Sequence, residues 1–138
     1  MARYASLEIP IRDRVAAGQA LAALLSAYRE RCDVIVLALP RGGVPVAYEI
    51  ATALNVRLDL MLVRKLGVPG HEELAMGAIA SGGVRVLNHD ILRMLGLGEV
   101  AVDSVVSREA HELQRRDQAY RAGRPVPVLQ GQQVLLVD

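Results

Sequence analysis

The sequence contains no Phe and no Trp, and its four Tyr residues are its only aromatic side chains. A packed interior must therefore be aliphatic, and hydrophobic residues make up 52% of the chain, which is enough to build one. A length of 138 residues predicts one domain, 1–138, with a single core.

Cysteine is almost absent. The only one, Cys32, excludes an internal disulfide and leaves no Cys/His cluster of the zinc-binding kind. Its position beside an apolar run predicts a buried structural thiol rather than a reactive one. No apolar run resembles a signal peptide or reaches the length of a membrane span, so we expect a cytoplasmic protein without a membrane partner.

The chain also has almost no excess of charge of either sign, because it contains 16 basic and 15 acidic residues and its net charge is +1. Such a balance provides no overall field that would attract nucleic acid. Arginines do gather in residues 108–124, but acidic side chains are interleaved among them at helical spacing. We interpret this stretch as a salt-bridged solvent face, with nucleic-acid binding as a minor alternative.

The apolar pattern predicts an α/β fold with a parallel sheet flanked by helices. Helical spacing is found in 12–30, where Asp13 is a plausible N-cap, and in 44–54. Strands of the buried type are predicted at 34–39, 58–63 and 134–137.

The middle of the chain has a different pattern. Residues 64–77 contain Gly, Pro and charged residues without a clear period, which predicts a mobile loop. A β-hairpin is predicted around Ser81-Gly82-Gly83, joining 77–80 to 84–87. A short helix over 89–96 and a longer one over 102–121 should follow.

Ligands of open α/β sheets bind at the carboxyl ends of the strands. The turn Pro40-Arg41-Gly42-Gly43 follows the first strand and opens a helix. Its glycines allow the backbone to approach a ligand, and Arg41 could bind phosphate oxygens through two hydrogen bonds. An ordinary tight turn with a solvated Arg is the alternative. The turn is neither a Walker A loop nor a GxGxxG fingerprint, which disfavours nucleoside triphosphates and NAD as ligands.

Arg64 and Lys65, the only lysine, directly follow the second predicted strand. We expect both cations at the same sheet edge as the turn, binding an anion, although a solvated charged pair is the alternative. His71, Glu72 and Glu73 follow in the loop and could transfer a proton or take part in loop closure, but a lone His in a loop is more often just solvated. Asp138 ends the last predicted strand at that same edge.

Three segments together resemble the type I phosphoribosyltransferases, and most nearly a bacterial branch generally described only as phosphoribosyltransferase-like. They are Leu37-Ala38-Leu39-Pro40-Arg41-Gly42-Gly43-Val44-Pro45-Val46-Ala47, Leu62-Val63-Arg64-Lys65-Leu66-Gly67 and Val134-Leu135-Leu136-Val137-Asp138. The resemblance runs from about Asp13 to the last residue. It implies a transferase that moves the phosphoribosyl group of phosphoribosyl pyrophosphate to a base or a similar nucleophile, with Mg²⁺ bound through the donor's diphosphate.

The resemblance also implies roles for individual residues. Pro40, Arg41, Gly42 and Gly43 match the family's pyrophosphate loop, which often carries a non-proline cis peptide. Arg64 and Lys65 match basic residues that contact pyrophosphate, and residues 66–75 match the flexible catalytic loop. Asp138 matches the first of two adjacent acids that hold the ribose hydroxyls.

Family members continue after this strand with a second acid and a Gly/Thr-rich loop for the 5-phosphate. We therefore expect a C-terminally truncated, incomplete fold that is inactive alone and that covers its open sheet by forming a homodimer or a swapped oligomer. Two other hypotheses stay open: a non-catalytic phosphate or pyrophosphate-binding module, and a structural protein that supplies a dimer surface.

Overall fold

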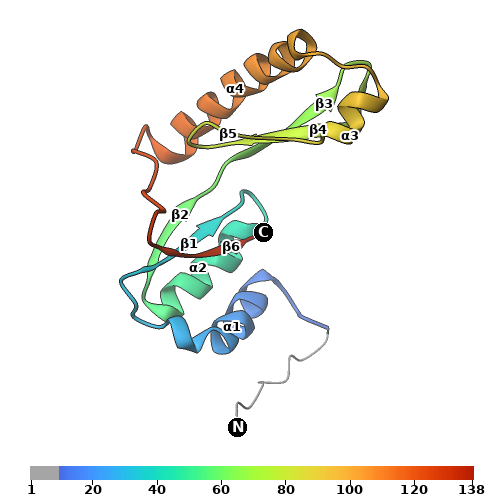
Figure 1. Cartoon of the computed structure of the whole chain (residues 1–138). Helices are drawn as coiled ribbons and strands as arrows, with labels where there is room; N and C mark the ends of the chain where they lie inside the picture. The colour runs from blue at the N-terminus through green and yellow to red at the C-terminus, as the bar shows by residue number, and fades with distance from the viewer. Residues whose placement is uncertain (1–9) are drawn as a thin grey trace. The chain divides into compact units, whose positions relative to one another are not determined.

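The structure is a computed structural model that describes residues 10–138 (Figure 1). Its elements in chain order are α1 (Arg14–Leu24), the short 3₁₀ helix η1 (Ser26–Tyr28), β1 (Val34–Ala38), α2 (Gly43–Leu54), β2 (Arg57–Leu60), β3 (Val63–Val68), β4 (His71–Ala80), β5 (Val84–Leu87), α3 (His89–Met94), α4 (Glu99–Arg121) and β6 (Gln133–Val137).

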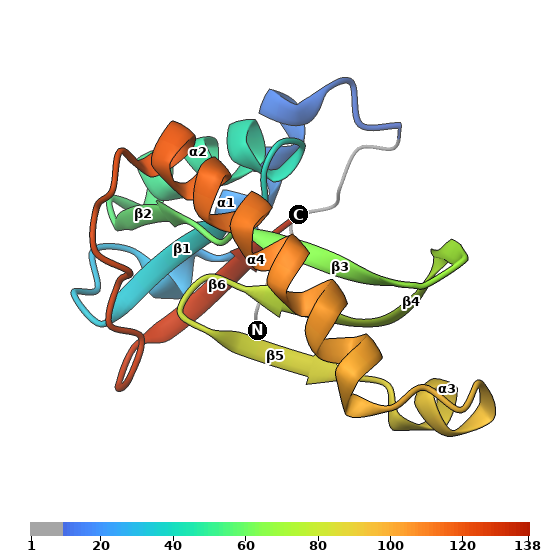
Figure 2. The same cartoon turned by 90° about the horizontal axis from the view of Figure 1, so that it is seen from above.

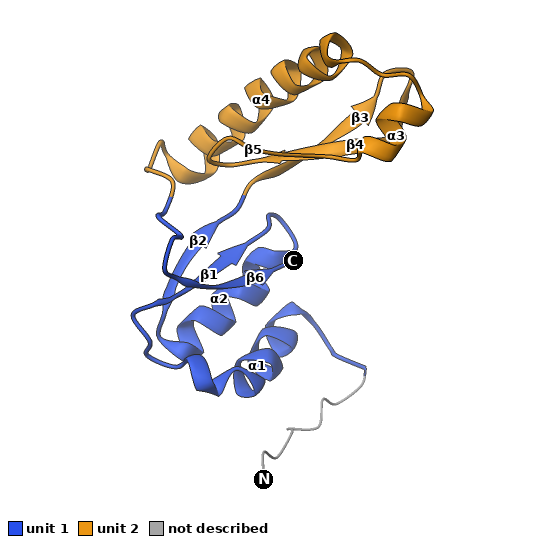
Figure 3. Cartoon of the chain, in the orientation of Figure 1, with its two compact units in different colours: residues 1–61, 127–138 blue, residues 62–126 orange. Residues whose placement is uncertain are grey.

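The chain divides into two compact units (Figure 3). Among the described residues, unit 1 comprises 10–61 and Pro127–Asp138, and unit 2 comprises Leu62–Val126. Each unit has its own cluster of buried hydrophobic side chains among the described residues. The length of the chain predicted one core, and the structure corrects this expectation.

Unit 1 contains a parallel sheet with the strand order β2-β1-β6. All five residues of the central strand β1 are buried, as the continuous apolar run predicted. The α/β class with a parallel sheet flanked by helices is therefore confirmed. Strand β6 is less buried than predicted, because the side chains of Val134 and Leu136 are exposed.

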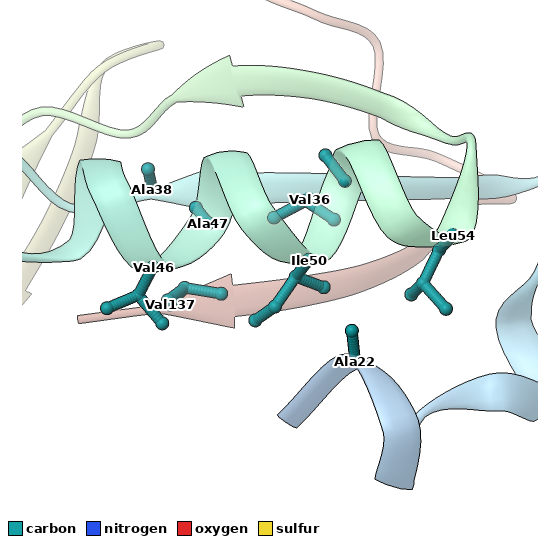
Figure 4. Packing of buried hydrophobic residues seen from close by; sticks show 9 residues of the cluster. Ala22, Val36, Ala38, Val46, Ala47, Ile50, Leu54 and Val137 are labelled. Carbon is teal, nitrogen blue, oxygen red and sulfur yellow. The ribbon is translucent and has the colours of Figure 1, made fainter. Parts of the chain in front are cut away.

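The helices of unit 1 form a layer against this sheet (Figure 4). Helix α2 packs its apolar face against β1 and β6, with Ile50 and Leu54 each 1% exposed. Helix α1 packs on α2 at Gly18, where an added Cβ would lie 2.6 Å from the Cβ of Glu49. As predicted, Asp13 caps α1, its carboxylate accepting a hydrogen bond from the Ala16 amide at 2.8 Å.

Unit 2 is an antiparallel sheet of order β3-β4-β5 with α4 packed on it (Figure 2). The predicted hairpin around Ser81-Gly82-Gly83 is confirmed as the β4–β5 connection. The loop predicted over 64–77 is wrong, because this segment forms most of β3 and the start of β4, joined at Pro69 and Gly70.

An irregularity in the β3–β4 ladder explains this failure. The register shifts on both sides of Gly67, so the alternation of apolar and polar residues is interrupted there. An added Cβ at Gly67 would lie 2.7 Å from the carbonyl oxygen of Glu72, so the two backbones meet where only glycine fits. A segment with glycine, proline and no period looks like a loop in sequence even when it pairs as strands.

Three further expectations change. The second parallel strand was predicted over 58–63, but β2 ends at Leu60 and Val63 already begins β3. Cys32, predicted to be buried, is exposed. Arg121, predicted on a solvent face, is 1% exposed and donates to the carboxylate of Asp117.

The other ion pairs predicted along α4 are present. Both Glu112 oxygens accept hydrogen bonds from Arg115, at 2.9 and 2.6 Å, and one also accepts from Arg116 at 3.0 Å. None of the helices within residues 10–138 combines the length and the apolar character needed to cross a membrane.

The Glu112 ion pairs predict a pH-dependent contribution to stability. Hydrogen bonds from Arg115, and then from Arg116, lower the pKa of Glu112 from 4.5 to about 2. Because the folded-state pKa is the lower one, the stabilisation is fully present above pH 4.5 and is lost as the pH falls towards about 2. Urea unfolding midpoints of the unchanged protein and Glu112→Gln should therefore differ most above pH 4.5 and converge near pH 2.

Glu73→Gln is the control, because Glu73 is exposed and takes part in no ion pair among residues 10–138. Its unfolding midpoint should follow that of the unchanged protein over this pH range. If both variants deviate equally, the Glu112 ion pairs are not the source of the effect.

Candidate functional site

The connection between β1 and α2 is a four-residue loop, 39–42, at the carboxyl end of the central strand. The loop is closed by two backbone hydrogen bonds, from the Gly43 amide to the Leu39 carbonyl at 3.0 Å and from the Val44 amide to the Arg41 carbonyl at 3.2 Å. The peptide bond between Pro40 and Arg41 is cis. The resemblance to the family implied a bond of this geometry in this loop.

The loop offers hydrogen-bond donors that the described part of the chain does not use. Within residues 10–138, neither the Arg41 amide nor the Gly42 amide donates a hydrogen bond, and the Arg41 guanidinium pairs with no acid. Both residues are exposed. Free amides at the beginning of a helix, with an exposed cationic side chain beside them, form an environment that favours a bound anion.

Asp138 lies beside this loop because of a close backbone contact. Gly43 is buried, and a Cβ added to it would lie 2.4 Å from the Val137 carbonyl oxygen and 3.1 Å from the Asp138 Cα. The end of β6 therefore contacts the first turn of α2 directly. The structure thus brings together five of the predicted site residues in unit 1: Pro40, Arg41, Gly42, Gly43 and Asp138.

A second arginine at this loop was missed by the sequence analysis. Two guanidinium nitrogens of Arg14, in the first turn of α1, lie 3.8 and 3.9 Å from the Cβ position of Gly42. The Asp13 cap places Arg14 at the start of a helix, and that much could be predicted from sequence. Its proximity to Gly42 depends on how α1 packs on α2, which no local pattern specifies.

Arg64 and Lys65 do not end a strand of the parallel sheet, contrary to the prediction. Both lie inside β3 of unit 2. Arg64 is engaged in an ion pair with Glu109 of α4, its two donor nitrogens lying 2.8 and 2.7 Å from one carboxylate oxygen. Lys65 is exposed and has no acidic partner among the described residues.

His71 and Glu72 begin β4 in unit 2, and both side chains are exposed. Within residues 10–138 neither forms an ion pair or a side-chain hydrogen bond. The same part of the chain contains no group of three or more His, Cys, Asp or Glu residues that could hold a metal ion. The roles predicted for these two residues remain predictions.

Unit 2 also has a pocket of about 410 Å³ between the β4–β5 hairpin and α4. Its charged lining residues are already paired, Arg85 with Asp103 and Asp117 with Arg121. The pocket therefore presents no free charge to a ligand. The 39–42 loop has amides and an Arg41 guanidinium without partners among residues 10–138, which makes it the better candidate for binding an anion.

Comparison with known proteins confirms the predicted resemblance. Two proteins of Mycobacterium tuberculosis, "Putative phosphoribosyl transferase MT0597" of strain CDC 1551 / Oshkosh and "Putative phosphoribosyl transferase Rv0571c" of strain H37Rv, are each 48% identical to this chain over 126 residues. The matched region covers 91% of this chain but only 28% of either relative. No family model matches the chain.

A solved structure agrees with the fold. The crystal structure of the protein TT1426 from Thermus thermophilus superposes with a TM-score of 0.77 and 41% sequence identity. The match covers 93% of this chain and 60% of that chain. This chain thus spans a little over a quarter of its curated relatives and about three fifths of the solved protein.

The contact at Gly43 predicts which glycine of the loop is indispensable. Gly43→Ala would drive a Cβ into the Val137 carbonyl, and relieving such a clash typically costs about 1–3 kcal/mol. Gly42→Ala is the matched control, because its Cβ would meet only the Arg14 side chain, at 3.8 Å, and its φ of −61° suits any residue. Chemical unfolding should show a clear loss of stability for Gly43→Ala and little change for Gly42→Ala. Equal effects of the two variants would contradict the contact.

Proposed function

We propose that this chain, which resembles proteins named "Putative phosphoribosyl transferase", is part of a phosphoribosyltransferase whose 39–42 loop binds the pyrophosphate group of phosphoribosyl pyrophosphate. One observation carries the proposal. Among residues 10–138, the backbone amides of Arg41 and Gly42 donate no hydrogen bond, and the Arg41 guanidinium beside them at the start of α2 has no acidic partner. The residues that form the proposed site all belong to unit 1.

The loop suits a diphosphate for three physical reasons. The Arg41 guanidinium can donate two parallel hydrogen bonds to one phosphoryl group. The free amides can donate to oxygens that the side chain does not reach. The N-terminus of α2 adds the positive end of a helix dipole, equivalent to roughly half an elementary charge.

The same groups suit the proposed reaction. When the bond between ribose C1 and the pyrophosphate oxygen breaks, its electron pair stays on pyrophosphate and the negative charge there grows. A base nitrogen or similar nucleophile forms the new bond to C1 and gives up its proton to the solvent. Donors already aimed at the leaving group stabilise that developing charge more than they stabilise the ground state.

Asp138 is assigned to the ribose in this proposal. Its Cα lies 3.1 Å from the Cβ position of Gly43, so a sugar attached to a loop-bound pyrophosphate would lie within reach of its carboxylate. A carboxylate accepts hydrogen bonds from hydroxyls, and a ribose presents two adjacent ones.

Mg²⁺ belongs to the proposal as a companion of the ligand. The described residues include no cluster of metal-binding side chains, so the diphosphate oxygens would supply most of its coordination. When bound, the ion would neutralise part of the leaving group's charge. The roles expected for Arg64, Lys65, His71 and Glu72 stay predictions.

The test is calorimetric titration of this chain with pyrophosphate and with phosphoribosyl pyrophosphate, each with and without Mg²⁺. Arg41→Gln should weaken the binding of both ligands about tenfold or more, because a charge-assisted hydrogen-bonded pair is lost. Binding of both ligands is expected, because the pyrophosphate group is common to them.

Arg29→Gln is the matched control, since it removes the same charge from an exposed residue of unit 1. The backbone amide of its neighbour Glu30 donates to the carbonyl of Leu54 at the far end of α2, so Arg29 lies away from the 39–42 loop. The affinity of Arg29→Gln for both ligands should equal that of the unchanged chain. Absence of binding by the unchanged chain, or equal losses in both variants, would refute the proposed site.

A further inference from the structure

We infer that Arg14 of α1 is a second anion-binding arginine of the 39–42 loop, and that it contacts the pyrophosphate group directly. This inference rests on the proposed function and adds to it a residue from a different element. The juxtaposition that carries it is the guanidinium of Arg14 beside Gly42, the residue whose free amide opens α2.

The position of Arg14 is determined by the packing of α1 on α2. At Gly18 the two helices approach so closely that an added Cβ would lie 2.7 Å from the Val46 carbonyl. Arg14 is one helical turn before Gly18, and Gly42 is the same four residues before Val46. The contact at Gly18 therefore carries Arg14 to the beginning of α2, where its guanidinium lies within 4 Å of the Gly42 Cβ position.

The charge of Arg14 is not neutralised by any of the residues that the structure describes. Within 10–138 it forms no ion pair and no side-chain hydrogen bond. The nearest acid in sequence, Asp13, is occupied, since one of its oxygens accepts from the Ala16 amide and the other lies 3.6 Å from Arg12. Among the described residues, Arg14 and Arg41 both have guanidiniums without an acidic partner, and both residues lie at the beginning of α2, so a bound anion would neutralise positive charge there.

A diphosphate has two phosphoryl groups, and the loop now offers two guanidiniums from two elements. Arg41 belongs to the loop itself, whereas Arg14 approaches Gly42 from α1. Each guanidinium can bind phosphate oxygens through two hydrogen bonds. The site therefore has enough cationic donors to bind both phosphoryl groups without a contribution from the residues of unit 2.

The test compares pyrophosphate binding by the unchanged chain, Arg14→Gln, Arg12→Gln and Arg41→Gln, using calorimetry without metal. Arg14→Gln should weaken binding about tenfold, and the weakening should diminish as the salt concentration rises and screens the lost charge. Arg12→Gln removes the same charge two residues away, from a side chain that is 85% exposed and beside Asp13, and should leave the affinity unchanged.

The outcomes separate this inference from the proposed function. If Arg41→Gln binds pyrophosphate about tenfold or more weakly than the unchanged chain, but Arg14→Gln binds as tightly as Arg12→Gln, the role of Arg14 is refuted and the site stands. If the unchanged chain does not bind pyrophosphate at all, both are refuted.

A loss of affinity through unfolding is excluded by two further measurements. Thermal unfolding of Arg14→Gln and Arg12→Gln should coincide. Arg14→Lys keeps the charge but cannot donate in a fork, so it should bind with an affinity between those of the unchanged chain and Arg14→Gln. NMR spectra test the contact itself. The Arg14 Nε–H signal is identified as the one present in the unchanged chain and absent from Arg14→Gln. This signal should shift when pyrophosphate is added to the unchanged chain, and a signal that does not shift would contradict direct contact.

Discussion

The contact between Gly43 and the end of β6 is the constraint on which the candidate site depends. The carbonyl oxygen of Val137 occupies the space that a side chain at position 43 would need. This contact lets α2 start directly against the edge of the parallel sheet, with Asp138 beside its first turn. Any larger residue at Gly43 would move either the helix or the strand, and the amides at the loop would move with it.

A second glycine extends the same principle to α1. Gly18 allows α1 to lie against α2 at a distance that a Cβ would prevent, and this close packing brings Arg14 to Gly42. The placement of Arg14 and of Asp138 at the proposed site therefore depends on two glycines, Gly18 and Gly43. At Gly18 and at Gly43, the absence of a side chain lets two elements approach closely, and this approach brings their polar groups together.

The departures from expectation are concentrated in unit 2. Arg64 was expected at the sheet edge because it follows an apolar run, but the run contains the end of one strand and the beginning of another in a different sheet. Its guanidinium is bound by Glu109, which is 45 residues away in sequence and beyond the reach of any local pattern. The register shifts at Gly67 similarly concealed β3 and β4, because strand prediction relies on an uninterrupted alternation.

Much of unit 1 could be predicted from the sequence alone. The continuous apolar run of β1 requires burial on both faces. The turn after it has the glycines and proline of a helix start, and Asp13 has the side chain of an N-cap. Each of these signals is local in the sequence. Tertiary structure alone decided that Arg14 lies at Gly42, that Arg64 is paired with Glu109, and that Cys32 is exposed. These outcomes depend on which surfaces pack together, and that is determined by the volume and shape of residues distant in the chain rather than by any pattern within a segment.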